Sequence, residues 1–317
     1  MQYRKLISLK YLLIILFSVI IGRYVNAQTE TSKRITIGNH SFTPISYSPL
    51  PATNTYINTL AGFGQTINLF HTITLPEDLG TIGIEGEVTF IDVYFSYQQR
   101  IRDWLAAYIR IGLAARLGTE FQSILAQGVN SVTDFEIGWH FKLLEREKYA
   151  FSATAELQNN AGSFINILGY VKDIINEHPN PQIMEKIPVL TVGSSFRFAY
   201  GFSDLIGMSA TTDFSYGETY IRGKNGLALS LGAGIDFDFY PRYSVPVGLI
   251  INYNITSQPE FVYVDGKYAH IWKTKIAYTK ASDFSLGLEY SIMKVPLPNT
   301  KKDPIVFSFA LATRFYF

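Results

Sequence analysis

The feature that constrains this chain most is the alternation of apolar side chains at every second position over long segments. Between residues 105 and 117, Leu, Ile and Ala occupy alternate positions, and Ala, Tyr, Arg and Gly fill the positions between them. Successive side chains of a strand point to opposite faces, whereas a helix repeats every 3.6 residues and would mix the two sets. The segment therefore predicts a long β-strand with one apolar face.

The same alternation returns in residues 133–143, 227–239 and 305–317. A soluble sandwich also alternates, but its strands usually run to ~5–6 residues and its outer face is polar. Here the second face is rich in Gly, Ala and Ser, and the apolar faces often end in aromatic residues such as Trp104 and Trp139. Aromatic girdles at both interfaces are typical of membrane barrels, so we predict an all-β, antiparallel transmembrane barrel.

About twelve strands are predicted, near 59–70, 84–98, 104–118, 131–144, 149–159, 188–200, 205–216, 227–240, 244–256, 269–279, 284–294 and 305–317. The short connections are 99–103, 145–148, 201–204, 241–243 and 280–283, and longer ones fall at 119–130, 160–188, 217–226, 257–268 and 294–304. Outer-membrane barrels have short periplasmic turns and long outer loops, so an even strand count places both ends of the barrel in the periplasm. The segments around Trp272 and before Glu87 are the weakest, which leaves 10 or 14 strands as alternatives.

The first 27 residues have the pattern of a secretory signal peptide. Basic residues precede a short apolar core at 11–21, and residues 25–27 (Val-Asn-Ala) form a small-x-small cleavage site. A retained anchor helix is the alternative, although the apolar core is too short for comfortable spanning. We therefore expect an exported chain whose mature form starts at Gln28.

Residues 28–58 differ from the alternating part of the chain. They carry Pro44, Pro49 and Pro51 among many Ser, Thr and Asn residues. Proline has no amide hydrogen to donate, so it is excluded from a central strand. We expect residues 28–58 to form a periplasmic lead-in or a lumen plug, and residues 59–317 to form the barrel.

Composition excludes several classes of function. Lys+Arg 27 against Asp+Glu 26 gives a net charge of +1, which leaves no basic surface for nucleic acid. The absence of cysteine excludes disulfides, thiolate metal sites and cysteine nucleophiles. Asp236 and Asp238 are neighbours on one predicted face, but no calcium-loop spacing surrounds them. We expect no cofactor and no metal.

The C-terminal strand carries a resemblance to a known class. The chain ends on Phe317, and Phe315, Leu311 and Phe309 share its face, with Thr313 as an interruption. This ending resembles the closing strand of Gram-negative outer-membrane β-barrel proteins. The resemblance implies a location in the outer membrane, contact with its lipid, and the barrel-assembly machinery as a transient partner.

The second face of the strands carries charged residues of both signs. We expect the lumen to be lined by Asp92, Arg110, Arg116, Asp134, Glu136, His140, Lys142, Glu156, Arg197, Asp213, Asp236, Asp238, Glu289 and Arg314. Such groups could pair and seal a narrow barrel, or line a water-filled pore. Two outer loops, 120–127 and 163–177, have apolar residues at helical spacing and are expected to form short helices.

No catalytic constellation stands out in the sequence. A barrel hydrolase of the outer-membrane phospholipase type has a histidine and a serine two residues apart on one strand face. None of the five histidines is followed two residues later by serine. His140 shares its predicted face with Glu136 and Asp134, but a nucleophile is missing, so we interpret it as a hydrogen-bonded lumen histidine.

Three functions are compatible with these features. The first is a small-solute channel or substrate-specific transporter, with passage along the charged lumen. The second is a structural or surface-binding barrel whose lumen is plugged. The third is a lipid-directed outer-membrane hydrolase, which lacks a visible nucleophile–base pair, so we expect a protein that is not an enzyme.

Overall fold

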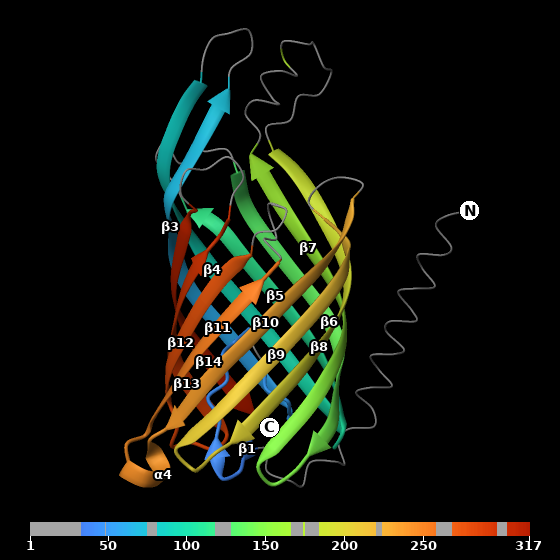
Figure 1. Ribbon diagram of the computed structural model, residues 1–317, viewed down its shortest axis with the longest axis vertical. Coiled ribbons are helices and arrows are strands. Elements are labelled where there is room, and N and C mark those ends of the chain that lie inside the picture. The colour runs from blue at the N-terminus through green and yellow to red at the C-terminus, as the bar shows by residue number, and fades with distance from the viewer. Residues whose placement is uncertain are drawn as a thin grey trace, which may run out of the picture. The chain divides into compact units, whose positions relative to one another are not determined.

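The computed structural model describes residues 33–47, 49–74, 81–117, 128–165, 174, 184–219, 224–257, 268–296 and 303–317. Within these residues, twelve strands, β3 to β14, form one closed barrel in which each strand pairs with its neighbours in the chain (Figure 1). β14 returns to pair with β3, and every pair is antiparallel. The predicted fold class and strand number are confirmed.

The barrel strands are β3 (Tyr56–Thr74), β4 (Thr81–Arg102), β5 (Leu105–Leu117), β6 (Gly128–Glu145), β7 (Tyr149–Ile165), β8 (Met184–Gly201), β9 (Ile206–Glu218), β10 (Asn225–Asp238), β11 (Val247–Thr256), β12 (Ala269–Tyr278), β13 (Phe284–Lys294) and β14 (Ile305–Tyr316). Each overlaps one predicted segment. β3 begins at Tyr56, so the last three residues of the predicted lead-in already belong to the barrel.

One predicted loop helix is partly wrong. Residues 163–165 were expected to begin a helix, but they are the last residues of β7 and pair with the start of β8. β7 continues as a strand there because residues 163–165 pair with residues 184–186 at the start of β8. Apart from Ile174, which is helical, the rest of that segment and all of 120–127 lie outside the described residues.

The short connections gather at one end of the barrel, where Phe317 also lies (Figure 1). We call this the short-turn end. The β10–β11 connection there contains a single helical turn, α4 (Tyr240–Tyr243), which ends on Ser244 with a φ of 55°. Across the part of the chain that the structure describes, no helix is both long and apolar enough to cross a membrane.

The barrel wall has its apolar side chains outside and its polar side chains inside. On β5, Ile111 is 45% exposed, whereas the inward Arg110 and Tyr108 are buried. Large exposed apolar residues recur around the wall: Phe63, Phe135, Ile137, Leu157, Val192, Leu227, Ile235, Leu288 and Leu311. An apolar belt around a polar interior is the surface of a transmembrane β-barrel.

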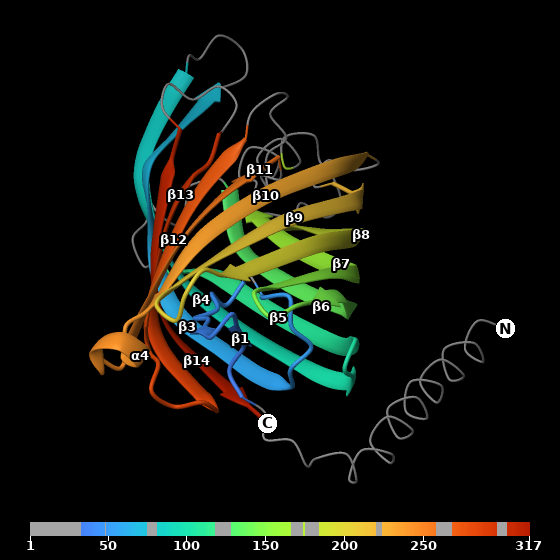
Figure 2. The same cartoon turned by 60° about the horizontal axis from the view of Figure 1, so that its bottom comes forward.

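The N-terminal segment lies inside the barrel at the short-turn end (Figure 2). Residues 33–47 and 49–55, which we call the plug, contain the small hairpin of β1 (Thr36–Ile37) and β2 (His40–Ser41). Gly38 and Asn39 turn this hairpin with φ values of 59° and 64°, which a two-residue turn of this kind requires. Phe42 of the plug is completely buried, in one apolar cluster with Ala150 and Ala199 of the wall.

Candidate functional site

The strand register sets a row of polar side chains across five neighbouring strands of the lumen wall. Arg314, Asn58, Ser96, Arg110 and Glu136 are successive cross-strand partners from β14 through β3, β4 and β5 to β6. Nη1 of Arg110 donates to both carboxylate oxygens of Glu136, at 2.7 and 2.9 Å. Nε of Arg314 donates to Oδ1 of Asn58 at 3.3 Å. Within this row the charge of Arg110 is compensated by Glu136, whereas the partner of Arg314 is a neutral amide.

None of the lumen residues expected from the sequence is exposed. Those that are buried are Arg110, Glu136, His140, Arg197, Asp236, Asp238, Glu289 and Arg314. Those that are half-buried are Asp92, Arg116, Asp134, Lys142, Glu156 and Asp213. They occupy the side of the wall opposite to the exposed apolar belt.

These residues do not form a single charged ring. Asp134 accepts from the amide of Gln158 at 3.2 Å, and Glu156 accepts from the hydroxyl of Tyr108 at 2.6 Å. Lys142 pairs with Glu145 at 2.5 Å beside the short turn, after an irregularity in the β6–β7 register. Among the described residues, no group of three or more His, Cys, Asp or Glu could hold a metal ion.

The sequence prediction missed a buried lysine. Lys275 on β12 has no exposed surface, and its Nζ lies 3.2 Å from Oε1 of Glu289 and donates to the carbonyl of Pro44 at 2.9 Å. The sequence does carry a signal for its inward position: Lys275 and Ala277 alternate with the outward-facing Ile276. The alternation is weak around Trp272 on the same strand, so the sequence pattern does not single out Lys275.

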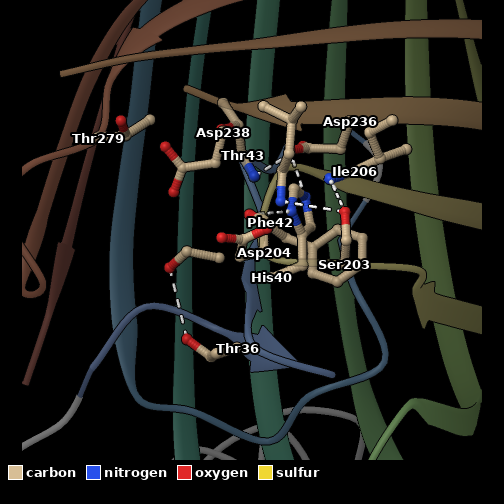
Figure 3. Close-up of polar contacts among 12 residues, drawn as sticks. Thr36, His40, Phe42, Thr43, Ser203, Asp204, Ile206, Asp236, Asp238 and Thr279 are labelled. Atoms are coloured by element: carbon tan, nitrogen blue, oxygen red, sulfur yellow. Dashed lines mark hydrogen bonds and ion pairs between the residues drawn. The ribbon is translucent and has the colours of Figure 1, made fainter. Parts of the chain in front are cut away.

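The plug is anchored to the wall by a buried histidine–aspartate pair (Figure 3). Nε2 of His40 lies 2.9 Å from Oδ1 of Asp236, and the backbone N–H of Thr43 donates to Oδ2 at 2.8 Å. The other ring nitrogen of His40 lies 3.1 Å from the carbonyl of Asp204. One wall carboxylate therefore fixes a side chain of the hairpin and the plug backbone that follows it.

Further along, the plug contacts the opposite side of the lumen. The backbone and hydroxyl of Ser46 both donate to Glu289, at 3.0 and 2.8 Å. The hydroxyl of Tyr47 donates to Asp92 at 2.9 Å, and its ring packs against Tyr94 at 4.3 Å. Tyr47 keeps 37% of its surface exposed. The plug thus spans the lumen from β10 to β4.

Three wall glycines leave room for the plug. A Cβ on Gly201 would overlap the backbone of the hairpin at Ile37 and Gly38, and one on Gly207 would overlap the side chains of His40 and Phe42. A Cβ on Gly248 would come within 2.6 Å of the hydroxyl of Thr43. The wall is therefore shaped to this segment, and larger residues at these positions are incompatible with it.

No protein-family model matches this sequence, and no curated protein matches it. Among solved structures, the NanC porin is similar with a TM-score of 0.50 and 7% identity, covering 81% of this chain and 98% of the porin. An outer membrane channel from Pseudomonas putida F1 is similar with a TM-score of 0.52 and 10% identity, covering 87% of this chain and 99% of the channel. This chain has the outer-membrane β-barrel fold. At such identities the likeness concerns the fold alone.

The residues that line the lumen of this barrel differ along its length. At the short-turn end the plug and the buried row of Arg314 to Glu136 occupy it. Further from that end the wall carries small and neutral polar residues that are half-buried: Gly193, Thr211, Ser215, Ser230 and Asn254. Small side chains on inward positions leave space inside a barrel of this size.

Proposed function

We propose that this protein is an outer-membrane channel or substrate-specific transporter for small solutes, closed at its periplasmic end by the plug. The observation that carries the proposal is the fit of the plug to the wall. The plug is held by separate polar anchors at Asp236, Glu289 and Asp92, in a wall whose glycines match its backbone. Polar anchors can be exchanged for water when the segment moves.

The size of the barrel supports passage of small molecules. Barrels of eight strands are filled by side chains, and those of sixteen or more leave a wide aqueous channel. This barrel of twelve strands lies between the two. Its unplugged part is lined by small and polar groups, which suits a hydrated or polar solute.

The channel proposal is tested by replacing Gly201 with alanine. The three atoms nearest to a Cβ there all belong to the plug backbone at Ile37 and Gly38, so we expect the hairpin to move away from the wall. Overpacking of this kind costs about 1–3 kcal/mol, which is about a 5- to 150-fold shift toward the displaced plug. In planar bilayers we expect rare conductance steps from the wild type and frequent steps from Gly201→Ala.

Gly112→Ala is the matched control, because a Cβ there meets its nearest neighbour at an ordinary 3.4 Å and touches no plug atom. Displacement is followed independently with a thiol reagent on Ile45→Cys, a plug position that is 1% exposed in a chain without native cysteine. Labelled plug cysteine without conductance would favour the structural, surface-binding barrel instead.

We also propose that the chain is exported by a cleaved signal and inserted through recognition of Phe317. The ring of Phe317 is 52% exposed, and its backbone N–H donates to the carbonyl of Thr55 at 3.2 Å. The ring is therefore available to a partner, whereas the backbone bond needs no particular side chain.

Phe317→Ala is accordingly expected to reduce the amount of folded barrel in the outer membrane severalfold, while Phe317→Tyr retains it. Heat-shifted mobility on gels measures the folded fraction. Both variants should refold equally well in detergent, because the side chain contributes little to the barrel itself. Equal insertion of all three proteins in cells would contradict recognition of the terminal ring.

A further inference from the structure

A second polar cluster lies on the wall beside the plug, and it joins three strands. Nε2 of His140 on β6 lies 2.8 Å from Oγ of Ser152 on β7. Nδ1 of the same ring lies 3.2 Å from Oε1 of Gln98 on β4. Ala106 on the intervening strand β5 is the cross-strand partner of His140, and its small side chain lets Gln98 reach across. All three polar side chains are buried.

The plug fixes which proton each of these groups carries. The amide nitrogen of Gln98 donates to the carbonyls of Ala52 and Asn54, both at 2.9 Å. Carbonyls only accept, so the amide oxygen of Gln98 must face His140 and accept from Nδ1–H. Nε2 of His140 then holds a lone pair and accepts the hydroxyl proton of Ser152. This is the arrangement of a serine nucleophile, a general base and a group that orients the base.

A buried arginine on the neighbouring strand shares the inward face of the wall with the serine. Arg197 on β8 is the cross-strand partner of Ser152 and is only 3% exposed. Its Nη2 donates to Ser195 at 3.2 Å, but its Nη1 has no hydrogen-bond partner within the described part of the chain. A buried, preorganised donor of this kind stabilises the oxyanion that forms when a carbonyl is attacked.

The space next to Ser152 and Arg197 is apolar and is filled by the plug. Ala150 and Ala199 are cross-strand partners. Each lies two residues closer to the short-turn end than Ser152 or Arg197, on the same inward face. The plug covers both with one apolar cluster formed by Ile35, Ile37, Phe42 and Leu50. Displacement of these four side chains would leave an apolar recess that suits a short acyl chain.

We propose that Ser152, His140, Gln98 and Arg197 form an acyl-ester hydrolysis site on the lumen wall, which the plug covers. Oγ of Ser152 bonds to the ester carbonyl carbon while His140 takes its proton, and Arg197 binds the resulting oxyanion. The carbon–oxygen bond to the alcohol breaks as His140 delivers the proton to the leaving oxygen. Water then attacks the acyl-serine, His140 takes a proton from it, and the proton returns to Ser152 as the carboxylic acid leaves. Gln98 acts as a positioning residue.

Displacing the hairpin leaves the part of the plug that orients Gln98 in place. Residues 52–54 end two positions before β3 begins at Tyr56, and the hydroxyl of Thr53 donates to the carbonyl of Asp103 at 2.8 Å. The atoms nearest to a Cβ on Gly201 belong to Ile37 and Gly38, far along the plug from residues 52–54. The Gly201→Ala variant should therefore uncover Ser152 without releasing Gln98.

The experiment treats the full-length Gly201→Ala protein with a fluorophosphonate probe and with p-nitrophenyl butyrate. We expect the probe to attach to Ser152, identified by peptide mass, and ester hydrolysis to appear, with little of either in the wild type. Ser152→Ala in the same background should abolish both, and His140→Ala should slow labelling by about 10²-fold or more. Ser209→Ala, another buried lumen serine, is the matched control and should change neither.

Access is measured in parallel with the thiol reagent on Ile45→Cys, and a Gly201→Ala/Gly248→Ala variant provides stronger displacement. An unlabelled Ser152 in a variant whose plug cysteine reacts would overturn the proposal and leave a purely structural hydrogen-bond network. A plug that stays shielded in both variants would overturn it as well, because the site would then have no entrance. Conductance of the same variants reports separately on the channel.

Discussion

Replacing Glu136 with alanine is expected to lower the free energy of unfolding of the barrel by about 3–5 kcal/mol, the cost of breaking a buried ion pair. Arg110 makes both of its hydrogen bonds to this carboxylate, and both side chains are buried. A guanidinium cannot lose its proton to escape the penalty. The truncation therefore removes the carboxylate that is hydrogen-bonded to this buried cation. The shift of the urea midpoint in lipid vesicles measures the effect.

The double variant Arg110→Met with Glu136→Leu is the control, because it removes both charges and keeps apolar volume. Replacing a whole buried pair in this way is often neutral or stabilising. We expect its midpoint to lie close to that of the wild type. A single Glu136→Ala variant as stable as the wild type would show that water reaches Arg110 and that the pair contributes little.

Replacing Lys275 with methionine is expected to destabilise the barrel by a similar amount, about 3–5 kcal/mol, and to loosen the plug. Methionine keeps the length of the stem but leaves the buried carboxylate of Glu289 without its cation. It also removes the donor to the carbonyl of Pro44. We therefore expect a lower denaturation midpoint together with faster thiol labelling of Ile45→Cys.

Lys273→Met is the matched control on the same strand. The Nζ of Lys273 lies over the ring of Tyr47 at 4.7 Å, a contact of about 0.5–2 kcal/mol. Its loss should affect plug labelling less than the loss of Lys275. Equal effects of the two substitutions would mean that net lumen charge, rather than the pair with Glu289, holds the plug.

One segment connects the two proposals. In these proposals the plug closes the lumen through the anchors of His40 at Asp236 and of Ser46 at Glu289, and its apolar side chains cover the recess beside Ser152. Movement of the hairpin would therefore open the passage and expose the hydrolysis site together. The Gly201→Ala protein separates them, because conductance and serine labelling are independent measurements.

The sequence by itself determined the strands and the direction in which their side chains point. Alternation has a period of two, and an apolar outer belt makes a shift by one residue costly, so Arg110 and Glu136 had to face inward. The same reasoning predicted a segment that overlaps each barrel strand, although the alternation is weak around Trp272 and before Glu87. It failed at 163–165, where pairing with β8 rather than local apolar spacing decided the conformation.

Only the tertiary structure decided which inward residues meet. His40 and Asp236 are 196 positions apart, and Ser46 and Glu289 are 243 apart, so no local pattern relates them. The serine sought two residues after a histidine is instead on the next strand, 12 positions from His140, and the orienting amide of Gln98 is 42 positions away. Closing the barrel and folding the plug into it set these distances. A period-two pattern assigns the facing of a residue but carries no information on its partner across the lumen.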